Sequence, residues 1–169
     1  MVAFTVLFFV FVVGVTIGGL LAVGKNPPSL FLFGLIAFAF LIVGFIGMVV
    51  GLLFPSFLIG FWFAEFIICI FAFLFIWAAV KTFHPNLGFM FGQKMGLNIL
   101  LCLFFFMGFE WGIFDLRAFF TLFASIIFTL SLFIGIFVQW QVKQKFWHFP
   151  YVVYAPCVWL FVFTIIKLF

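Results

Sequence analysis

From Leu30 to Val80 the chain carries one charged residue, Glu65, and this long apolar run constrains the fold more than any other feature. As a single α-helix the run would be about 75 Å long, which is more than twice the ~30 Å thickness of a bilayer's hydrocarbon core. It must therefore turn back on itself, and Pro55 followed by Ser56 marks the corner. The pattern predicts a chain that crosses a membrane more than once.

The composition of the whole chain excludes a soluble protein. Of the 169 residues, 70% are hydrophobic and 6% are charged, whereas a soluble domain has roughly 25% charged residues. The apolar stretches are continuous and do not alternate over strands of about ten residues, so a membrane β-barrel is excluded as well. The predicted fold class is all-α: one polytopic transmembrane helix bundle over residues 1–169, with five to six spans.

Charges and prolines divide the chain into six predicted spans, at about residues 3–24, 31–54, 57–80, 95–109, 118–138 and 151–168. The fourth has only about 22 Å of apolar length, so it crosses only with little tilt and with Lys94 snorkelling. Glu110, Asp115 and Arg117 are predicted to mark the turn that follows it. With six spans, five lysines fall on one side of the membrane, and the positive-inside rule then places both termini outside.

The charge pattern and the cysteines exclude several kinds of site. The formal net charge of +4 is scattered without a run of three basic residues, so no nucleic-acid partner is predicted. The three cysteines lie in apolar stretches and form neither a CxxC pair nor a disulfide framework. His84 and His148 fall in predicted loops, where an interfacial position is favoured over haem ligation. The chain is predicted to bind no cofactor and no metal, and to have no catalytic residue of its own.

Glu65 is the one acidic residue within a predicted span. A carboxylate at that depth is costly unless it is neutral, paired or facing water. Gly60 and Ala64 form a small-xxx-small pair beside it, which permits the close approach of another helix. The functional interpretation is a proton relay or coupling carboxylate, and the structural alternative is a protonated hydrogen-bond donor.

Small and hydroxyl residues at helical spacing predict where helices pack together. In a membrane, helices approach closely where Gly, Ser or Thr recur about one turn apart. In the first, second and fifth spans these residues are Gly14 and Gly18, Gly47 and Gly51, and Thr121, Ser125 and Thr129. They indicate helix neighbours and are not assigned a transport role.

The first three predicted spans resemble those of a known family. After an apolar opening helix, Asn26-Pro27 leads into a second one, and the third reads EFIICIFAFLFIW from Glu65 to Trp77. This order resembles chain 6 of NADH–quinone oxidoreductase, the J-type membrane subunit of respiratory complex I, in a divergent organellar version. Gly112-Ile113-Phe114 is similar to that family's entry into its last helix. Cys69 and Phe71 stand where the family has Tyr and Gly, and the sixth span is one more than the family has.

The resemblance implies a membrane-arm subunit of a proton-translocating NADH:quinone oxidoreductase, which helps couple quinone reduction to proton movement. Glu65 would belong to the complex's chain of protonatable residues, and Cys69, Phe71 and Ala72 would lie at the switchable part of the third helix. FMN, iron–sulfur clusters and ubiquinone would be bound by other subunits. The implied partners are membrane subunits and lipids, in the mitochondrial inner membrane or, alternatively, a bacterial inner membrane.

Other functions stay open on the sequence. A structural multi-span subunit of a respiratory assembly would show the same glycine pairs and the same lack of an active site. A small transporter is expected to carry an internal repeat or several charges within the membrane, and the sequence displays neither. The proton-channel subunit of ATP synthase needs an arginine inside a span, whereas Arg117 lies at a span end.

Overall fold

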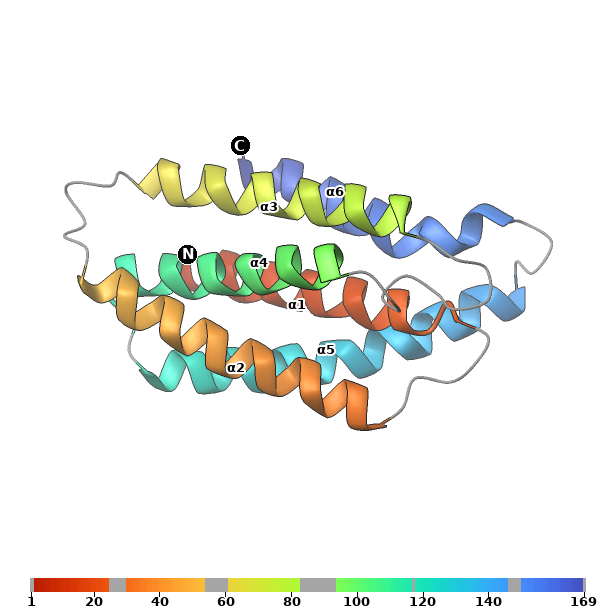
Figure 1. The fold of residues 1–169 in the computed structure, drawn as a ribbon, viewed down its shortest axis with the longest axis horizontal. Helices are drawn as coiled ribbons and strands as arrows, with labels where there is room; N and C mark the ends of the chain where they lie inside the picture. The colour runs from red at the N-terminus through yellow and green to blue at the C-terminus, as the bar shows by residue number, and fades with distance from the viewer. Residues whose placement is uncertain are drawn as a thin grey trace.

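Six α-helices make up the described part of the chain (Figure 1). The structure, a computed structural model, describes residues 2–24, 30–53, 61–82, 94–116, 118–145 and 150–168. The helices are α1 (Val2–Leu21), α2 (Leu30–Leu53), α3 (Phe61–Lys81), α4 (Lys94–Ile113), α5 (Ala118–Lys145) and α6 (Ala155–Leu168), and the 3-10 helix η1 (Pro150–Tyr154) leads into α6. No strand occurs in these ranges. The fold is an all-α helix bundle.

The helices have the length and the surface of membrane spans. Each of the six, with α6 extended back to Tyr151, is long and apolar enough to cross a bilayer. Apolar side chains cover the outside as well as the inside, and Phe31, Trp62 and Phe119 are among the most exposed residues. A helix that is apolar all round suits lipid on one side and protein on the other. The chain is a multi-pass membrane protein.

The fourth helix is longer than the hydropathy pattern predicts. α4 continues past Phe109 and through Glu110 to Ile113, and its 20 residues reach about 30 Å, which is enough to cross the hydrocarbon core. Two features keep these residues helical: Gly108 and Gly112 pack closely against α2, and the Glu110 carboxylate is paired within the bundle. Glu110 therefore lies in a helix and not in the predicted turn.

The fifth helix also extends beyond its predicted end, to Lys145. In this extension the Lys143 ammonium donates hydrogen bonds to the carbonyl oxygens of Ala22 and Val23, at 3.4 and 2.9 Å. Those carbonyls directly follow α1, where backbone acceptors have no partner within the helix. Lys143 thus ties the end of α5 to the end of α1.

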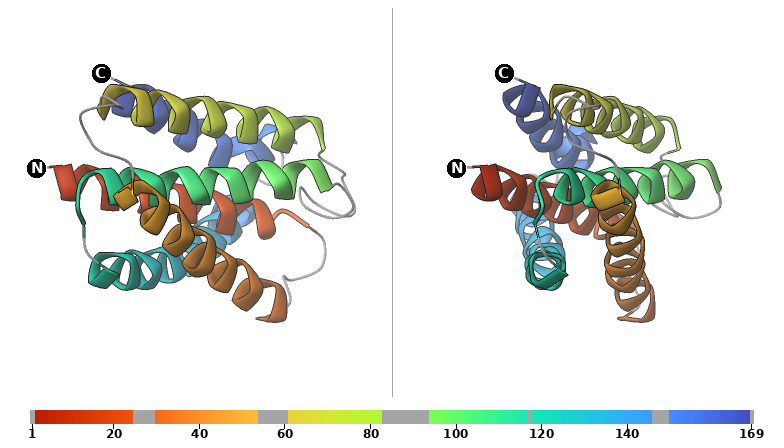
Figure 2. Two further views of the ribbon diagram at one scale, coloured as in Figure 1. Left: turned by 60° about the vertical axis from the view of Figure 1, so that its left-hand side comes forward. Right: turned by 90° about the vertical axis from the view of Figure 1, so that its left-hand side faces the viewer.

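The helices form two stacks of three, which Figure 2 shows end-on. One stack is α6–α1–α5 and the other is α3–α4–α2. Within the stacks, α1 packs on α5 and α6, while α4 packs on α2 and α3; between the stacks, α2 meets α5 and α3 meets α6. Side chains from both stacks form one hydrophobic core, in which Phe40 of α2 stacks on Phe128 of α5 at a centroid distance of 4.0 Å.

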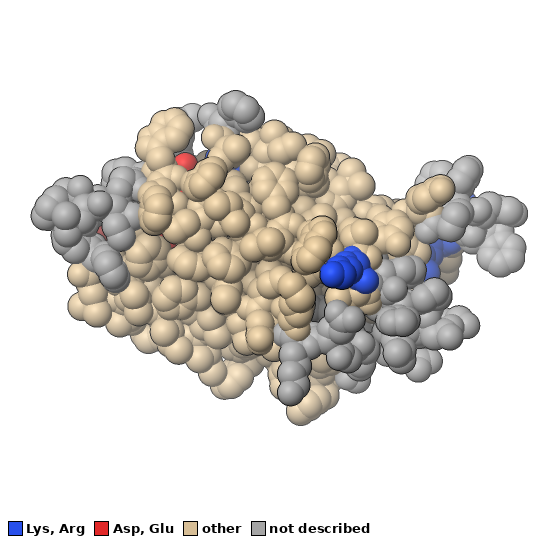
Figure 3. Space-filling view, turned by 45° about the horizontal axis from the view of Figure 1, so that its top comes forward, with Lys and Arg blue, Asp and Glu red and all other residues tan. Residues whose placement is uncertain are grey.

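The two ends of the bundle differ in charge. Both termini lie at one end, together with the passages from α2 to α3 and from α4 to α5 (Figures 1 and 2). We call this the acidic end and the opposite one the basic end. The residues concerned are Glu65, Glu110 and Asp115 at the acidic end and Lys81, Lys143 and Lys145 at the basic end. In Figure 3 acidic atoms are visible to the left and the most prominent basic ones to the right of an otherwise uncharged face.

The helix contacts relate the first three helices to the last three. If α1 is exchanged with α4, α2 with α5 and α3 with α6, the contacts within and between the stacks are reproduced. Each helix runs antiparallel to its equivalent (Figure 1). The operation is therefore an approximate two-fold rotation about an axis across the helices, which exchanges the two stacks. The chain consists of two three-helix repeats of inverted topology.

Individual glycine contacts follow the same relation. A Cβ on Gly18 of α1 would meet the backbone of Leu132 in α5, and a Cβ on Gly112 of α4 would meet the backbone of Met48 in α2. In return, a Cβ on Gly135 would meet Val15, and a Cβ on Gly51 would meet Phe109. Equivalent pairs of helices thus cross at equivalent points, with backbone against backbone.

The third and sixth helices correspond as well. Ala64, Ile68 and Ala72 of α3 are buried, and so are Pro156, Leu160 and Thr164 at the equivalent positions of α6. The sequence displays no internal repeat because equivalent positions share size or burial and rarely identity. The repeat is therefore one of helix arrangement and not of sequence.

The residues predicted to pack helices mostly lie at these crossings. Gly14 and Gly18 face α5, and Gly47 and Gly51 face α4. Ser131 of α5 faces Gly14 and Gly112 of α4 faces Gly51, while Gly108 of α4 packs on Gly44 of α2 and Gly135 of α5 packs on Val15 and Gly19 of α1.

The hydroxyl stripe of α5 has mixed roles. Buried Thr121 donates to the Met48 sulfur of α2 at 3.0 Å, and Ser125 is buried beside it. Thr129 bonds within its own helix, to the Ser125 carbonyl oxygen at 2.8 Å. Ala64 is buried, and Gly60 lies outside the described residues.

Candidate functional site

A buried ion pair joins the two stacks at the acidic end. The Lys167 ammonium lies 2.7 Å from the Glu110 carboxylate, and each side chain is only 2% exposed. Glu110 stands in the last turn of α4 and Lys167 in the last turn of α6, and both helices end there. Each charge is tolerated inside the bundle because the other one neutralises it.

Two further helices surround this pair. From α1, the Phe9 ring faces the Lys167 ammonium, with 5.2 Å between the nitrogen and the ring centroid. From α3, the Cys69 sulfur lies 3.7 Å from the Thr164 carbonyl oxygen, one turn before Lys167. Four helices therefore converge on the ion pair, and apolar side chains and one thiol separate it from the lipid.

Glu65 stands beside this cluster on α3. It lies in the second turn of the described helix and is half-buried, and the predicted start of the span at residue 57 lies outside the described residues. Cys69, which contacts α6, follows Glu65 by one turn of α3. Among the described residues it forms neither an ion pair nor a hydrogen bond.

The three ionisable groups do not balance in charge. Glu65 and Glu110 are two carboxylates, and Lys167 supplies one ammonium group. With all three groups ionised, they carry one net negative charge.

The repeat allows the charged cluster to be compared with the equivalent residues at the other end, and those residues are uncharged. By the correspondence of α1 with α4 and of α3 with α6, the equivalents of Glu110, Lys167 and Glu65 are Thr16, Phe75 and Cys157. These are buried, and at the basic end Thr16 donates to the Pro156 carbonyl oxygen at 3.3 Å. Two similar frameworks therefore hold an ionisable cluster at one end and an uncharged one at the other.

The predicted hinge residues lie in a regular part of α3. The helix is α-helical from Phe61 to Lys81, so no π-turn interrupts it within those residues. Cys69 contacts α6, Phe71 stacks on Phe106 of α4 at 4.9 Å, and Ala72 is fully buried. These residues lie at the contacts of α3 with both neighbours.

The sequence singles out Glu65, whereas the structure pairs two residues that the sequence does not single out, Glu110 and Lys167. The sequence pattern predicts Glu110 in a turn. One signal was available: Gly108 and Gly112 extend a small-xxx-small pattern past Phe109, which predicts a helix through Glu110. His84, Arg117 and His148 lie outside the described residues.

Comparison of the chain with protein families, with curated proteins and with solved structures finds no match in any of the three. The assignment of a function depends on the geometry described above.

Proposed function

We propose that this chain is a small proton-coupled membrane transporter built from two inverted three-helix repeats. The repeat is the observation that carries the proposal. Inverted repeats related by an axis in the membrane plane are typical of secondary transporters, in which one body rocks against another. Here the tight glycine crossings of α1 with α5 and of α4 with α2 favour two rigid stacks as the moving bodies.

The ion pair supports a coupling role. Glu110 belongs to one stack and Lys167 to the other, so their contact fastens the stacks together at the acidic end. A proton that neutralises Glu110 removes its attraction for the Lys167 ammonium group, so the ion pair no longer holds the two stacks together. Glu65, next to the pair and half-exposed, is the group through which that proton would enter. Proton binding would thereby shift the balance between two arrangements of the stacks.

Proton binding is measurable without a known substrate. The purified chain is reconstituted into liposomes on a capacitive sensor, and a pH step is applied while the transient charge displacement is recorded. We expect a displacement that is lost in Glu65→Gln. The matched control is Asp115→Asn, which removes an exposed acid at the same end and should keep the signal. A displacement of equal size in wild type and Glu65→Gln contradicts the proposal and favours a purely structural role.

A second candidate is the membrane-arm subunit of NADH:quinone oxidoreductase that the third helix resembles. The placement of Glu65 beside a second carboxylate and a lysine favours it, because protonatable groups in sequence can conduct protons along a membrane arm. In that role the chain would work in the mitochondrial inner membrane or a bacterial inner membrane, among other membrane subunits. FMN, iron–sulfur clusters and ubiquinone would remain with those partners.

Native electrophoresis separates the two candidates. Membranes are solubilised in mild detergent, resolved, stained in the gel for NADH oxidation and probed for this chain. Migration with a large NADH-oxidising band supports the respiratory subunit and rejects an independent transporter. Migration as a small species, with a pH-driven charge displacement that needs Glu65, supports the transporter.

A further inference from the structure

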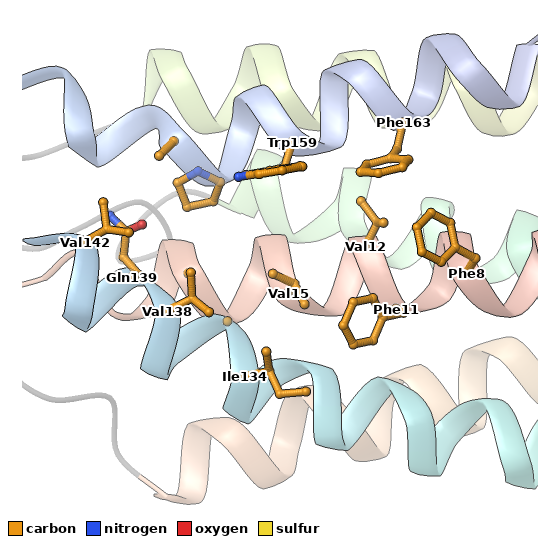
Figure 4. Close-up of a pocket in the computed structure, with 14 residues that line it drawn as sticks. Phe8, Phe11, Val12, Val15, Ile134, Val138, Gln139, Val142, Trp159 and Phe163 are labelled. Carbon is orange, nitrogen blue, oxygen red and sulfur yellow. The ribbon is translucent and has the colours of Figure 1, made fainter.

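An apolar groove lies between α5 and α6, with α1 as its floor (Figure 4). Its volume is about 370 Å³, which falls within the range of ligand pockets in proteins, roughly 300–1,000 Å³. Figure 4 shows Trp159 and Phe163 of α6 facing Val15 and Phe11 of α1 across the space, with Ile134 and Val138 of α5 along its side. Gln139 is the one lining residue with a side-chain amide, and it lies toward the basic end.

The groove has the length of one membrane leaflet. Between Phe8 and Gly19, which line its two ends, α1 rises about 17 Å. The hydrocarbon core is ~30 Å thick, so half of it is about 15 Å. The groove begins at Phe8 and Phe163, next to the contact of Phe9 with Lys167, and reaches the level of Val142, close to the basic end of α5. A single extended acyl chain has this reach and this polarity.

The other repeat shows that the space is not a general consequence of the fold. At the equivalent positions α4 has larger side chains: Phe106 for Val12, Phe109 for Val15 and Ile113 for Gly19. These larger residues pack against Ala64 and Val50 in a small hydrophobic cluster of their own. At equivalent places one repeat thus carries large side chains that pack together, whereas the other carries smaller ones that line the groove.

Two lysines at the basic end of the groove favour the binding of an anion. Lys143, whose ammonium donates to the carbonyl oxygens of Ala22 and Val23 and keeps its positive charge, follows directly after Val142 of the lining, and the exposed Lys145 ends the same helix. All three acidic residues of the chain lie at the opposite end, so no carboxylate of this protein balances these lysines. A phospholipid with an anionic headgroup supplies both the acyl chain and the missing charge, whereas a neighbouring apolar helix supplies only the first.

We infer that this groove binds one acyl chain of an anionic phospholipid, with its headgroup held at Lys143 and Lys145. The site is independent of the transport proposal, because it uses neither Glu65 nor the Glu110–Lys167 pair. Its position at the basic end is consistent with the leaflet that carries anionic lipid at its surface when the positive-inside rule is obeyed.

Native mass spectrometry of the full chain tests the inference directly. The protein is released from micelles with palmitoyl-oleoyl phosphatidylglycerol or with phosphatidylcholine of the same acyl chains, and bound lipid is counted. We expect phosphatidylglycerol to be retained more strongly, by about fivefold for each lysine that contributes. Lys143→Gln combined with Lys145→Gln should remove this preference, while Lys81→Gln, at the same end but on α3, should keep it.

The second variant fills the groove with a larger side chain. Val15→Phe introduces the side chain that the equivalent position of α4 already carries, so the fold has a precedent for it. It should lower the retention of both lipids at least fivefold, with an unchanged helical circular dichroism spectrum. Equal retention of the two lipids by wild type, or full retention by Val15→Phe, overturns the inference. A dimer that Val15→Phe dissociates would assign the groove to a second copy and overturn it as well.

Discussion

At the scale of single residues, the Glu110–Lys167 pair is the most consequential contact in the described structure. Both groups are almost completely buried, and a second carboxylate, Glu65, lies half-buried on α3, the helix that packs on both α4 and α6. A buried pair of this kind adds little net stability over a well-packed apolar pair, but removing one member leaves the other charge uncompensated. The stability of the acidic end should therefore depend on the pair as a unit.

Single and double substitutions should separate these two effects. Lys167→Met leaves the Glu110 carboxylate alone and is expected to destabilise the protein by about 3–5 kcal/mol. Adding Glu110→Gln should restore most of that loss, because neither charge then remains. Thermal unfolding in detergent, followed by circular dichroism, provides the measurement, and Asp115→Asn is the exposed control at the same end. Additive losses in the double variant would mean that the two groups act independently.

At the scale of helices, the close crossings of α2 with α4 and of α1 with α5 organise the bundle. In both crossings glycine positions put one helix backbone directly against the other, so that an added methyl group has no space. In a membrane, this packing takes the place that the hydrophobic effect has between helices in water. The inverted repeat predicts that equivalent glycines are equally sensitive.

Alanine substitutions test this equivalence. Gly18→Ala and Gly112→Ala should each destabilise the protein by a similar amount, about 1–3 kcal/mol, because the new Cβ meets backbone atoms that cannot move aside. Gly34→Ala, where nothing lies within 4 Å, should be neutral or slightly stabilising, since alanine favours helix over glycine. The retained fraction of monodisperse protein after a temperature series gives the ranking. If Gly18→Ala destabilises the protein and Gly112→Ala does not, the two-fold relation is contradicted.

At the scale of the whole molecule, six helices place both chain termini and all acidic residues at one end, and three of the lysines at the other. With an even number of crossings, the positive-inside rule leads us to expect the basic end in the cytoplasm or its organellar equivalent.

Cysteine labelling measures this orientation. In a background where Cys69, Cys102 and Cys157 are replaced by alanine, Asp115→Cys should react with a membrane-impermeant maleimide added outside intact cells or mitoplasts. Lys145→Cys should react only after permeabilisation, because it lies at the opposite end. Labelling of both positions from the same side would show that one of the six helices does not cross.

The sequence by itself determined the fold class and the approximate spans, because burial in lipid requires continuous apolar helices whatever their neighbours are. The predicted corner at Pro55 lies outside the described residues. The sequence also drew attention to Glu65 and to the four glycines of α1 and α2, since a charge or a small residue in such a run is conspicuous. Hydropathy could not place Glu110 and Lys167 in the interior, because each is tolerated there only through the other, and they meet only once α4 and α6 are packed.

The tertiary structure alone decided the inverted repeat and the groove. Both depend on which helices touch, and in a membrane those contacts depend on shape complementarity more than on residue identity. Gly18 and Gly112 are equivalent because their helices cross their partners in the same way. Val15 and Phe109 also occupy equivalent positions, but the smaller valine leaves space for the groove beside α1. A linear pattern of apolar residues carries no record of either relation, since valine and phenylalanine are equally compatible with lipid.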